Sequence, residues 1–573
     1  MSRLRRIWKY SEGQRAALVA LPLLILIQVI MEIWIPRIMG DMMDVGIYSG
    51  SMSVILRQGA LMIIASLGMT LSGLAISRAV SVWAAGLARN MRDDLFRRIQ
   101  ELAFSDLDEY GTASLLTRMS TDMNYVKKGA GMLSSLIHCP VMVAITIVVT
   151  VRSYPGISVV FLAGTGGLVV ISVILIHFVV RHYRRMLSCY ENLNELLVEN
   201  ITAQKTVKAF AREDYEKELF VKRAEHLRRE SRIAESLTAL NEPLMNLAIN
   251  MCILGIVILS GRAIQGGSMQ AGDFFCLISY ANNILFQISV FALIAVPVIN
   301  SMVSMDRVFE VTDKEVSIKD GEGAGHVPDG SVCFDHVGFG YHKGSDEVLK
   351  DISLNIKSGE FIGIIGSSGS GKTTLVNLIP RFYDVGCGTL TVGGTDVRRY
   401  KLDELRGMIG LVPQTSLLFS GTIAENLRWG NEDAGMEDMV KAASMAGAND
   451  FIMHKDEGYG TMLSQGGSSL SGGQRQRLCI ARALVRKPKI LIMDDSLSAV
   501  DRTTEEEILE SLRSRLEDTT VILVSQRFSS VQNADRIVVL DRGRIDAVGT
   551  HNHLLEESRV YRELYETQRR MME

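Results

Sequence analysis

Paired cysteines and an excess of one charge are both missing from this chain. Its seven cysteines are far apart, and none belongs to a Cys-x-x-Cys pair (Cys139, Cys189, Cys252, Cys276, Cys333, Cys387 and Cys479). This spacing gives no sign of a disulfide framework or a zinc site, so the cysteines are expected to be small apolar fillers. With 61 basic and 64 acidic residues, the net charge is −3. We therefore expect no nucleic-acid partner.

Glycine and proline are absent from Leu168 to Glu242. These two residues are the strongest interrupters of helices, so their absence favours helices that continue without a break. The stretch starts in an apolar region and passes into a strongly charged one. It predicts helices that extend well beyond the apolar region, with a docking surface at their tips.

Hydrophobic runs crowd into the first 300 residues. The hydrophobic fraction is 47% and the mean hydropathy is +0.18, both high for a soluble protein. Runs near the ~20 residues that span a bilayer lie at about 16–36, 58–78, 131–151, 156–180, 243–263 and 274–303. The 573 residues also exceed a single hydrophobic core. We expect a six-span membrane domain over residues 1–312 and at least one further domain.

Lysine and arginine are unevenly distributed between these runs. Residues 1–15, 85–129 and 181–240 hold five, seven and twelve of them, whereas the alternate loops hold only Arg152 and Arg262. Basic loops stay on the cytoplasmic side, so both termini are expected in the cytoplasm and the chain in the plasma membrane. No small-residue cleavage site follows the first run, which favours an uncleaved helix over a signal peptide.

After the sixth run the composition changes. Residues 313–330 read DKEVSIKDGEGAGHVPDG, a polar, glycine-rich stretch that is typical of a linker. From residue 331 to residue 573, short apolar strands alternate with helical segments, as in an α/β domain.

The sequence GSSGSGKTT at residues 366–374 fits the P-loop pattern and follows the apolar run 361–365. In a P-loop, glycines let the backbone approach phosphates, the lysine reaches the outer phosphates and the hydroxyl binds Mg²⁺. We expect ATP with Mg²⁺, with Lys372 and Thr373 in the last two roles. The predicted ATP-binding residues of this motif are Gly366, Ser367, Ser368, Gly369, Ser370, Gly371, Lys372, Thr373 and Thr374.

A second motif, LSGGQ at residues 470–474, is followed by RQRLCIARAL. With the P-loop, it makes the second half of the chain resemble the nucleotide-binding domain of ABC transporters. By this resemblance Tyr341 stacks on adenine, a contact that suits any base, Gln414 is the Q-loop glutamine and a metal ligand, and Asp494 ends the Walker B strand and holds the metal. Residues 498–501 are the D-loop.

Six spans before one such domain resemble an exporter half-transporter of this family. Residues 109–122 and 199–213 resemble its intracellular loops, whose short coupling helices rest on the ATPase domains. In the family, the P-loop of one subunit and the LSGGQ of the other enclose each ATP. The resemblance implies that Ser471, Gly472, Gly473 and Gln474 act on the ATP of a second half-transporter.

Two positions depart from the family pattern. Asp495 stands where a catalytic glutamate is usual, and Gln526 in VSQRF stands where a switch histidine is usual. A carboxylate one methylene shorter lies roughly 1 Å from its proper place, which costs on the order of 10²-fold in rate. Glutamine can neither carry an imidazolium charge nor relay a proton.

We therefore interpret this chain as the degenerate-site subunit of a heterodimeric exporter of the bacterial type, with slow turnover at its own P-loop. Gln414, Asp495 and Gln526 are its catalytic candidates. Two alternatives stay open: a homodimeric exporter of a peptide or lipid in which Asp495 hydrolyses ATP adequately, and an ATP-binding regulatory subunit that gates a partner.

Polar residues within the spans are candidates for a substrate pathway, because burying them in lipid is costly. Glu32, Asn282, Asn283 and Gln287 are the main candidates, and His138, His177 and Asn250 are further ones. Amides also link neighbouring helices, which is an alternative role for each. The 28 methionines suit an adaptable apolar surface, so a hydrophobic or amphipathic, multidrug-like substrate is the leading hypothesis.

Overall fold

The chain divides into two compact units in the computed structural model, which describes residues 3–323, 325, 327–341 and 346–572. Unit 1 comprises Met1–Gln100 and Thr112–Lys314, and unit 2 comprises Glu101–Gly111 and Glu315–Glu573. The short segment 101–111 therefore belongs to the unit formed by the second half of the chain.

Unit 1 is helical throughout its described residues. Its helices are α1 (Arg3–Tyr10), α2 (Arg15–Asp41), α3 (Met52–Glu101), α5 (Thr112–Thr117), α6 (Met123–Gly131), α7 (Leu133–Ser153), α8 (Pro155–Thr202), α9 (Gln204–Ala209), α10 (Glu213–Ala239), α11 (Asn241–Gln265) and α12 (Ala271–Thr312), with π-helical turns at Met42–Ile47 and Arg118–Asp122.

Six helical stretches of the described chain are long and apolar enough to cross a membrane: Arg15–Ile47, Met52–Glu101, Thr112–Ser153, Pro155–Thr202, Glu213–Gln265 and Ala271–Thr312. Each contains one predicted span, so the six-span prediction is confirmed. Helix α8 has 48 residues and is therefore ~70 Å long, more than twice the ~30 Å of a hydrocarbon core. The predicted extension of the helices beyond the membrane is thus present.

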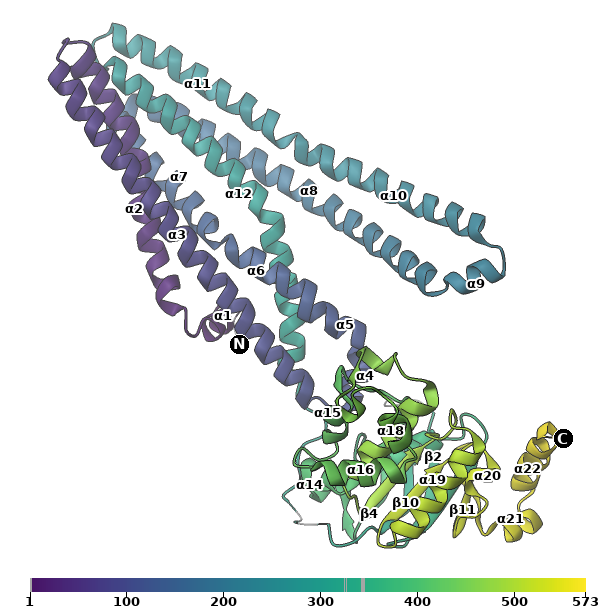
Figure 1. The fold of residues 1–573 in the computed structure, drawn as a ribbon. Coiled ribbons are helices and arrows are strands. Elements are labelled where there is room, and N and C mark those ends of the chain that lie inside the picture. Colours follow the sequence, from purple (N-terminus) through teal and green to yellow (C-terminus); the bar gives the residue numbers. More distant parts are fainter. Residues whose placement is uncertain (1–2, 324, 326, 342–345, 573) are drawn as a thin grey trace. The chain divides into compact units, whose positions relative to one another are not determined.

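Helix α12 is the centre of unit 1, where it packs against α2, α6, α7, α8 and α11. Its crossing with α2 is close: a Cβ on Gly272 would lie 2.2 Å from the carbonyl oxygen of Gly40, so only glycine permits this approach. On another side of the unit, α8 lies beside α10 and α11 (Figure 1), and the short helix α9 joins α8 to α10 at the far end.

Unit 2 contains three sheets. Its strands are β1 (Val332–Phe339), β2 (Leu349–Ile356), β3 (Phe361–Gly366), β4 (Cys387–Val392), β5 (Thr395–Asp396), β6 (Ile409–Val412), β7 (Gly421–Thr422), β8 (Met462–Leu463), β9 (Ile490–Asp494), β10 (Thr520–Val524), β11 (Arg536–Asp541) and β12 (Arg544–Gly549). The largest sheet has the order β12-β11-β3-β10-β9-β6, and a four-stranded antiparallel sheet has the order β2-β1-β4-β5.

The helices of unit 2 are α4 (Phe104–Tyr110), α13 (Lys372–Leu378), α14 (Leu402–Gly407), α15 (Ile423–Arg428), α16 (Met436–Met445), α17 (Asn449–Met453), α18 (Gly472–Val485), α19 (Arg502–Arg515), α20 (Phe528–Val531), α21 (His551–Glu557) and α22 (Arg559–Met572). Short 3₁₀ turns lie at Val397–Arg399, Gly458–Gly460 and Gln465–Gly467.

The six-stranded sheet is the middle layer of unit 2. Its inner strands β3, β9 and β10 are buried along their whole length, as parallel strands covered on both faces are. Alternate side chains separate two cores: Leu491 and Leu523 pack with α16 and α18, whereas Ile492 and Ile522 pack with α13 and the antiparallel sheet. This layering confirms the predicted α/β domain and exposes the carboxyl ends of the parallel strands.

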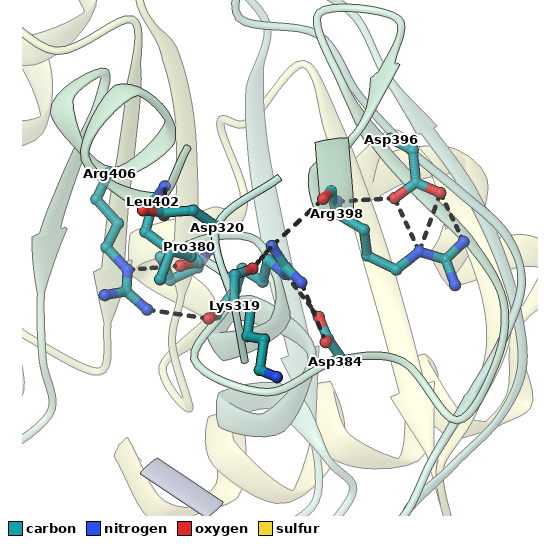
Figure 2. Close-up of polar contacts among 9 residues, drawn as sticks. Lys319, Asp320, Pro380, Asp384, Asp396, Arg398, Leu402 and Arg406 are labelled. Carbon is teal, nitrogen blue, oxygen red and sulfur yellow. Dashed lines mark hydrogen bonds and ion pairs between the residues drawn. The ribbon is translucent and has the colours of Figure 1, made fainter. Parts of the chain in front are cut away.

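The predicted linker is tied to unit 2 by a buried arginine. The Arg381 side chain is 6% exposed; it pairs with Asp384 (Nε to Oδ1, 2.7 Å) and donates to the backbone oxygens of Lys319 (3.1 Å) and Arg398 (3.5 Å). Figure 2 shows Lys319, Asp384 and Arg398 converging on this point, and Asp320 accepting a hydrogen bond from the Leu402 amide (2.9 Å). The first half of the segment 313–330 is therefore held on the surface of unit 2.

Helix α4 is anchored to unit 2 as well. The Phe104 ring lies 4.6 Å from the Phe382 ring, and the Tyr383 hydroxyl donates to Asp108 at 2.7 Å. Burial and the Asp108 carboxylate both raise the pKa of Tyr383, so the phenol stays protonated as a donor. Asp106 is buried and accepts hydrogen bonds from the amide and hydroxyl of Ser317, which links α4 to the linker segment.

We predict that Arg381→Met destabilises unit 2 by about 2–4 kcal/mol, because it removes a buried charge that satisfies a carboxylate and two carbonyls. The full chain in detergent should melt earlier, and residues 315–323 should exchange amide hydrogens faster by mass spectrometry. Arg398→Met is the control, since the Arg398 side chain is 45% exposed and pairs only with Asp396. Equal exchange in the two variants would contradict the anchoring role of Arg381.

Candidate nucleotide-binding and catalytic site

Four of the predicted motifs meet at one edge of the six-stranded sheet. The P-loop follows β3, Asp494 ends β9 and Asp495 follows it, Gln526 follows β10 and Gln414 follows β6. These strands are parallel and adjacent in the order β3-β10-β9-β6. Ligands of open α/β sheets bind at the carboxyl ends of such strands, so the sheet itself assembles the site.

The P-loop wraps tightly around the start of α13. Gly371 precedes the helix with φ of 101°, a conformation that disfavours other residues. At Gly366, a Cβ would lie 2.1 Å from the backbone oxygen of Leu540. Residues 367–369 are exposed while Ser370 is buried, so the loop presents its backbone outward at a helix start, as phosphate binding requires.

The Lys372 side chain lies across the P-loop. Its Nζ donates to the backbone oxygens of Gly366 (2.9 Å) and Ser367 (2.7 Å), and the side chain is buried. Burial lowers the pKa of this amine, against the opposing effect of the Asp495 and Asp494 carboxylates. The amine is thus confined to the loop, within reach of phosphate oxygens bound there.

The predicted metal ligands fit Mg²⁺ in part. The Thr373 hydroxyl donates to Asp494 Oδ1 at 3.1 Å, which pairs two oxygen ligands of the hard type that Mg²⁺ prefers. Burial, with the nearby Asp495, raises the pKa of Asp494, whereas Thr373 and Lys372 work against that rise. Mg²⁺ usually takes only one or two protein carboxylates, and the described residues include no cluster of three His, Cys, Asp or Glu. Gln414 follows β6, the strand next to β9 in the sheet, and its side chain is exposed.

Asp495 and Gln526, the two departures from the family pattern, contact each other. Gln526 Nε2 donates to Asp495 Oδ2 at 3.1 Å. The Asp495 backbone has φ of 45°, and its amide donates to the Val524 oxygen (2.9 Å), which prolongs the β9–β10 ladder by one bond. One carboxylate oxygen of Asp495 is therefore occupied by the amide of Gln526.

Tyr341 lies beside the first turn of α13, the helix that follows the P-loop. Its ring is 39% exposed, and its hydroxyl is 2.9 Å from the Thr374 hydroxyl. The ring meets Tyr383 edge to face at 5.2 Å and Phe339 at 5.1 Å. An exposed aromatic face held by two other rings is suited to stacking on a base.

The LSGGQ motif forms the start of α18. Ser471 caps this helix: its Oγ accepts from the Gln474 amide (3.2 Å), and the Gln474 side chain accepts from the Ser471 amide (3.1 Å). This reciprocal capping box leaves Ser471 exposed. The Gly472 and Gly473 amides at the same helix start favour an anion.

Two residues that position the D-loop were not identified from the sequence. Gln476 donates to the Ser498 hydroxyl (3.2 Å) and accepts from the Ala499 amide (2.9 Å), which fixes the D-loop against the signature helix. Arg527 donates to the backbone oxygen of Ser498 (2.7 Å) and pairs with Glu505 (3.0 Å). Their only sequence signal is a place beside a motif, because the partners lie 22 or more residues away.

In unit 1 the structure brings together some of the predicted pathway residues. Glu32 Oε2 lies 3.3 Å from His138 Nε2, and Gln287 Oε1 lies 3.3 Å from His138 Nδ1. Asn282 is exposed and donates to the Ile278 oxygen of its own helix (3.0 Å), and Asn283 is half-buried. Glu32 and Gln287 therefore share a site, and the two asparagines do not join it.

Comparison with known proteins places both units in one family. Residues 349–498 match the ABC transporter family and residues 18–289 match the ABC transporter transmembrane region. The "Uncharacterized ABC transporter ATP-binding protein YfiB" of Bacillus subtilis is 33% identical over 555 residues, 95% of each chain. The "Putative multidrug export ATP-binding/permease protein YgaD" of the same species is 32% identical over 85% of this chain and 84% of that protein.

A third relative is the "ATP-dependent lipid A-core flippase" of Chromobacterium violaceum, 30% identical over 86% of this chain and 85% of that protein. Among solved structures, the "Structure of a bacterial Atm1-family ABC exporter with ATP bound" has a TM-score of 0.84 with 24% identity, over 97% of this chain and 98% of that chain, and supports the fold. The chain belongs to the ABC transporter family: it is an exporter half-transporter in which a multi-pass plasma-membrane domain is joined to one ATP-hydrolysing domain.

Proposed function

We propose that this chain is the slow-site half of a heterodimeric exporter that moves a hydrophobic or amphipathic substrate. Its own P-loop binds ATP with Mg²⁺ and turns it over slowly. Fast hydrolysis takes place at the other site, where this chain supplies LSGGQ and a different chain supplies the P-loop, the catalytic glutamate and the switch histidine.

The observation that carries this proposal is the hydrogen bond between Gln526 and Asp495 at 3.1 Å. The two substituted positions form one interacting pair, which favours a coordinated change over unrelated losses. In this arrangement the Asp495 side chain is one methylene shorter than that of glutamate. One of its carboxylate oxygens also accepts a hydrogen bond from the Gln526 amide. A general base must lie within hydrogen-bond reach of the water it activates, and Gln526 offers no charge for the γ-phosphate.

The groups proposed to bind nucleotide also support the proposal, because their contacts follow the family pattern. Lys372 is held at the loop, and Thr373 remains bonded to Asp494. Ser471 also retains its full capping box. The contacts of the P-loop and signature residues are therefore kept, whereas the two residues proposed to handle the attacking water depart from the family pattern. When bound, Mg²⁺ would neutralise charge on the phosphates, and Thr373 and Asp494 are placed to hold it.

The surface of the tip formed by α9 and its flanking residues is evidence for contact with a second subunit. Ile201 is 73% exposed, Phe210 74% and Tyr215 58%, and a groove of about 750 Å³ lies between α8, α9 and α10. Large apolar side chains concentrated on one surface indicate a protein contact. The family resemblance implies an ATPase domain at this tip. Because α4 already contacts this chain's own ATPase domain, we assign the α9 tip to the partner's domain.

The relatives support the substrate class. One is named for multidrug export and another for a lipid A-core flippase, and drugs and lipids of these kinds carry apolar surface. We therefore infer a hydrophobic or amphipathic substrate for this chain.

The first prediction concerns the two ATP sites of the purified pair, this chain with the half-transporter that co-purifies with it. Glu→Gln at the partner's Walker B position should abolish steady-state ATP hydrolysis, whereas Asp495→Asn should change it less than twofold. In the blocked pair, Asp495→Glu with Gln526→His should restore turnover on the order of 10²-fold, because both groups regain their reach and charge.

Asp518→Glu is a matched control, since it makes the same change at an exposed aspartate before β10, at the end of that strand opposite to the site. A different result would point to the homodimer. If this chain purified alone hydrolyses ATP briskly and Asp495→Asn abolishes that activity, Asp495 is a working catalytic carboxylate and the proposal fails.

The second prediction concerns α4 as the link between the spans and the ATPase domain. Phe104→Ala removes the ring that packs on Phe382 and should weaken docking by about 1–2 kcal/mol. ATP-driven uptake of a fluorescent amphipathic dye into inside-out vesicles should fall at least fivefold, while ATP turnover persists. Phe96→Ala is the control, because Phe96 is an exposed phenylalanine of α3. Equal transport by both variants would argue against coupling through α4.

A further inference from the structure

The C-terminal helix α22 packs on the segment that carries Gln526. Tyr561, Tyr565 and Gln568 are spaced by four and three residues, so their side chains lie on one face of this helix. The Tyr561 and Tyr565 rings meet the Phe528 ring edge to face at 4.9 Å and 5.5 Å. Tyr561 and Phe528 are buried. The two tyrosines therefore fix α22 to the residues that follow β10.

Gln568 stands where the apolar face of α22 would continue, and its amide has two backbone partners. Its Nε2 donates to the Gln526 oxygen (2.5 Å), and its Oε1 accepts from the Phe528 amide (3.2 Å). An amide nitrogen only donates and an amide oxygen only accepts, so these partners define the orientation of the Gln568 side chain. Gln568 therefore holds the backbone on both sides of Arg527.

The Gln568 amide takes the place of a strand beyond the end of the sheet. Strand β10 ends at Val524, and the Ser525 amide still donates to the Ile364 oxygen of β3 at 3.2 Å. Arg527 remains extended, with φ of −94° and ψ of 128°. In an extended chain, the oxygen of one residue and the N–H group two residues later face the same side. A single side-chain amide can therefore pair with both.

The position of this backbone determines where two side chains reach. Gln526 Nε2 donates to Asp495 Oδ2 at 3.1 Å, and Arg527 donates to the Ser498 oxygen of the D-loop at 2.7 Å. The Gln526 side chain is exposed. Its amide nitrogen carries two hydrogens, so the bond to Asp495 leaves one N–H group for a phosphate oxygen. A shift of the backbone would move both contacts together.

We propose that Gln568 is a positioning residue of the ATP site. By holding the backbone on both sides of Arg527, it places the Gln526 amide where its second N–H group donates to the γ-phosphate of ATP on this chain's P-loop. Gln568 lies 42 residues after Gln526 in the chain and acts through it rather than on the nucleotide. ADP has no γ-phosphate and gains nothing from this contact. The C-terminal helix thus contributes to the preference of the site for ATP over ADP.

The test is nucleotide competition in the full chain, purified in detergent with any half-transporter that accompanies it. A radiolabelled azido-ADP is photo-crosslinked with Mg²⁺ present, while ADP or the non-hydrolysable β,γ-imido analogue of ATP displaces it, and the label is read on this chain after electrophoresis. Gln568→Met keeps the side-chain length and removes both hydrogen bonds. It should weaken the ATP analogue about fivefold, or ~1 kcal/mol, the contribution of one neutral hydrogen bond, and ADP less than twofold.

A double-mutant cycle separates positioning from packing. In a Gln526→Ala chain, Gln568→Met should not weaken the ATP analogue further, because the side chain that Gln568 positions is gone. Gln568→Glu keeps the oxygen that accepts from Phe528 and loses the donor to Gln526, so it should weaken the ATP analogue at least twofold. Gln532→Met is the matched control, since Gln532 is an exposed glutamine directly after α20, and it should change neither affinity.

Three results would overturn the inference: an unchanged affinity of both Gln568 variants for the ATP analogue, an equal loss for the ATP analogue and ADP, or an effect of Gln568→Met that persists in the Gln526→Ala chain. If Gln568→Met does not fold and takes up no label, Gln568→Glu decides. None of these measurements requires hydrolysis. Failure of the proposed heterodimer would therefore appear separately, in the ATPase measurements.

Discussion

The ATP site of this chain depends on one element of backbone pairing, the parallel ladder that β10 makes with β3 on one side and β9 on the other. Val524 is in register with Ile364 of β3 and with Asp494 of β9. That register sets Asp494, the last residue of β9, level with Ile364, two residues before the end of β3. The P-loop that follows β3 then carries Thr373 to Asp494. The register also sets Asp495 level with the residues that follow β10, so Gln526 reaches Asp495. The Thr373–Asp494 contact and the Gln526–Asp495 contact therefore both follow from the same strand register.

The sequence predicted the parts of this site whose signal is local. The P-loop, the signature and the Walker B carboxylate each need a particular residue at a particular step of the backbone, and that need is readable in a few adjacent letters. The spans were equally readable, because a bilayer imposes a length and a composition on each helix. The cytoplasmic extensions of the helices are polar and carry no hydropathy signal, and they were predicted instead from the absence of glycine and proline between Leu168 and Glu242.

Contacts between distant segments could not be predicted in this way. The family resemblance implied that the loop at residues 109–122 docks on an ATPase domain, but not that α4 belongs with unit 2 of the same chain, because its partners Ser317, Phe382 and Tyr383 are more than 200 residues away. The same is true of Arg381, whose charge reads as a surface residue until its backbone partners are known. Asp495 and Gln526 were each identified from the family pattern, but only the fold brings them into one pair.

The aromatic cluster around Tyr383 connects α4 to Tyr341, the residue proposed to stack on adenine. Tyr383 touches Tyr341 edge to face at 5.2 Å and donates to Asp108 of α4 at 2.7 Å. A base stacked on Tyr341 would restrict that ring, and an edge-to-face neighbour with one fixed hydrogen bond has few alternative positions. Tyr341, the residue proposed to stack on adenine, and the loop helix α4 therefore share Tyr383 as a neighbour.

This arrangement gives a slowly hydrolysing site a role in the proposed heterodimer. A ligand stabilises whichever state binds it better, whether or not it is later hydrolysed. ATP held between this chain's P-loop and the partner's signature would favour the closed state for as long as it stays bound, and α4 would pass that bias to the spans. An aspartate in place of the catalytic glutamate removes none of these contacts. In this proposal fast turnover is needed at only one site, because hydrolysis there removes the contacts that its ATP contributes to the closed state.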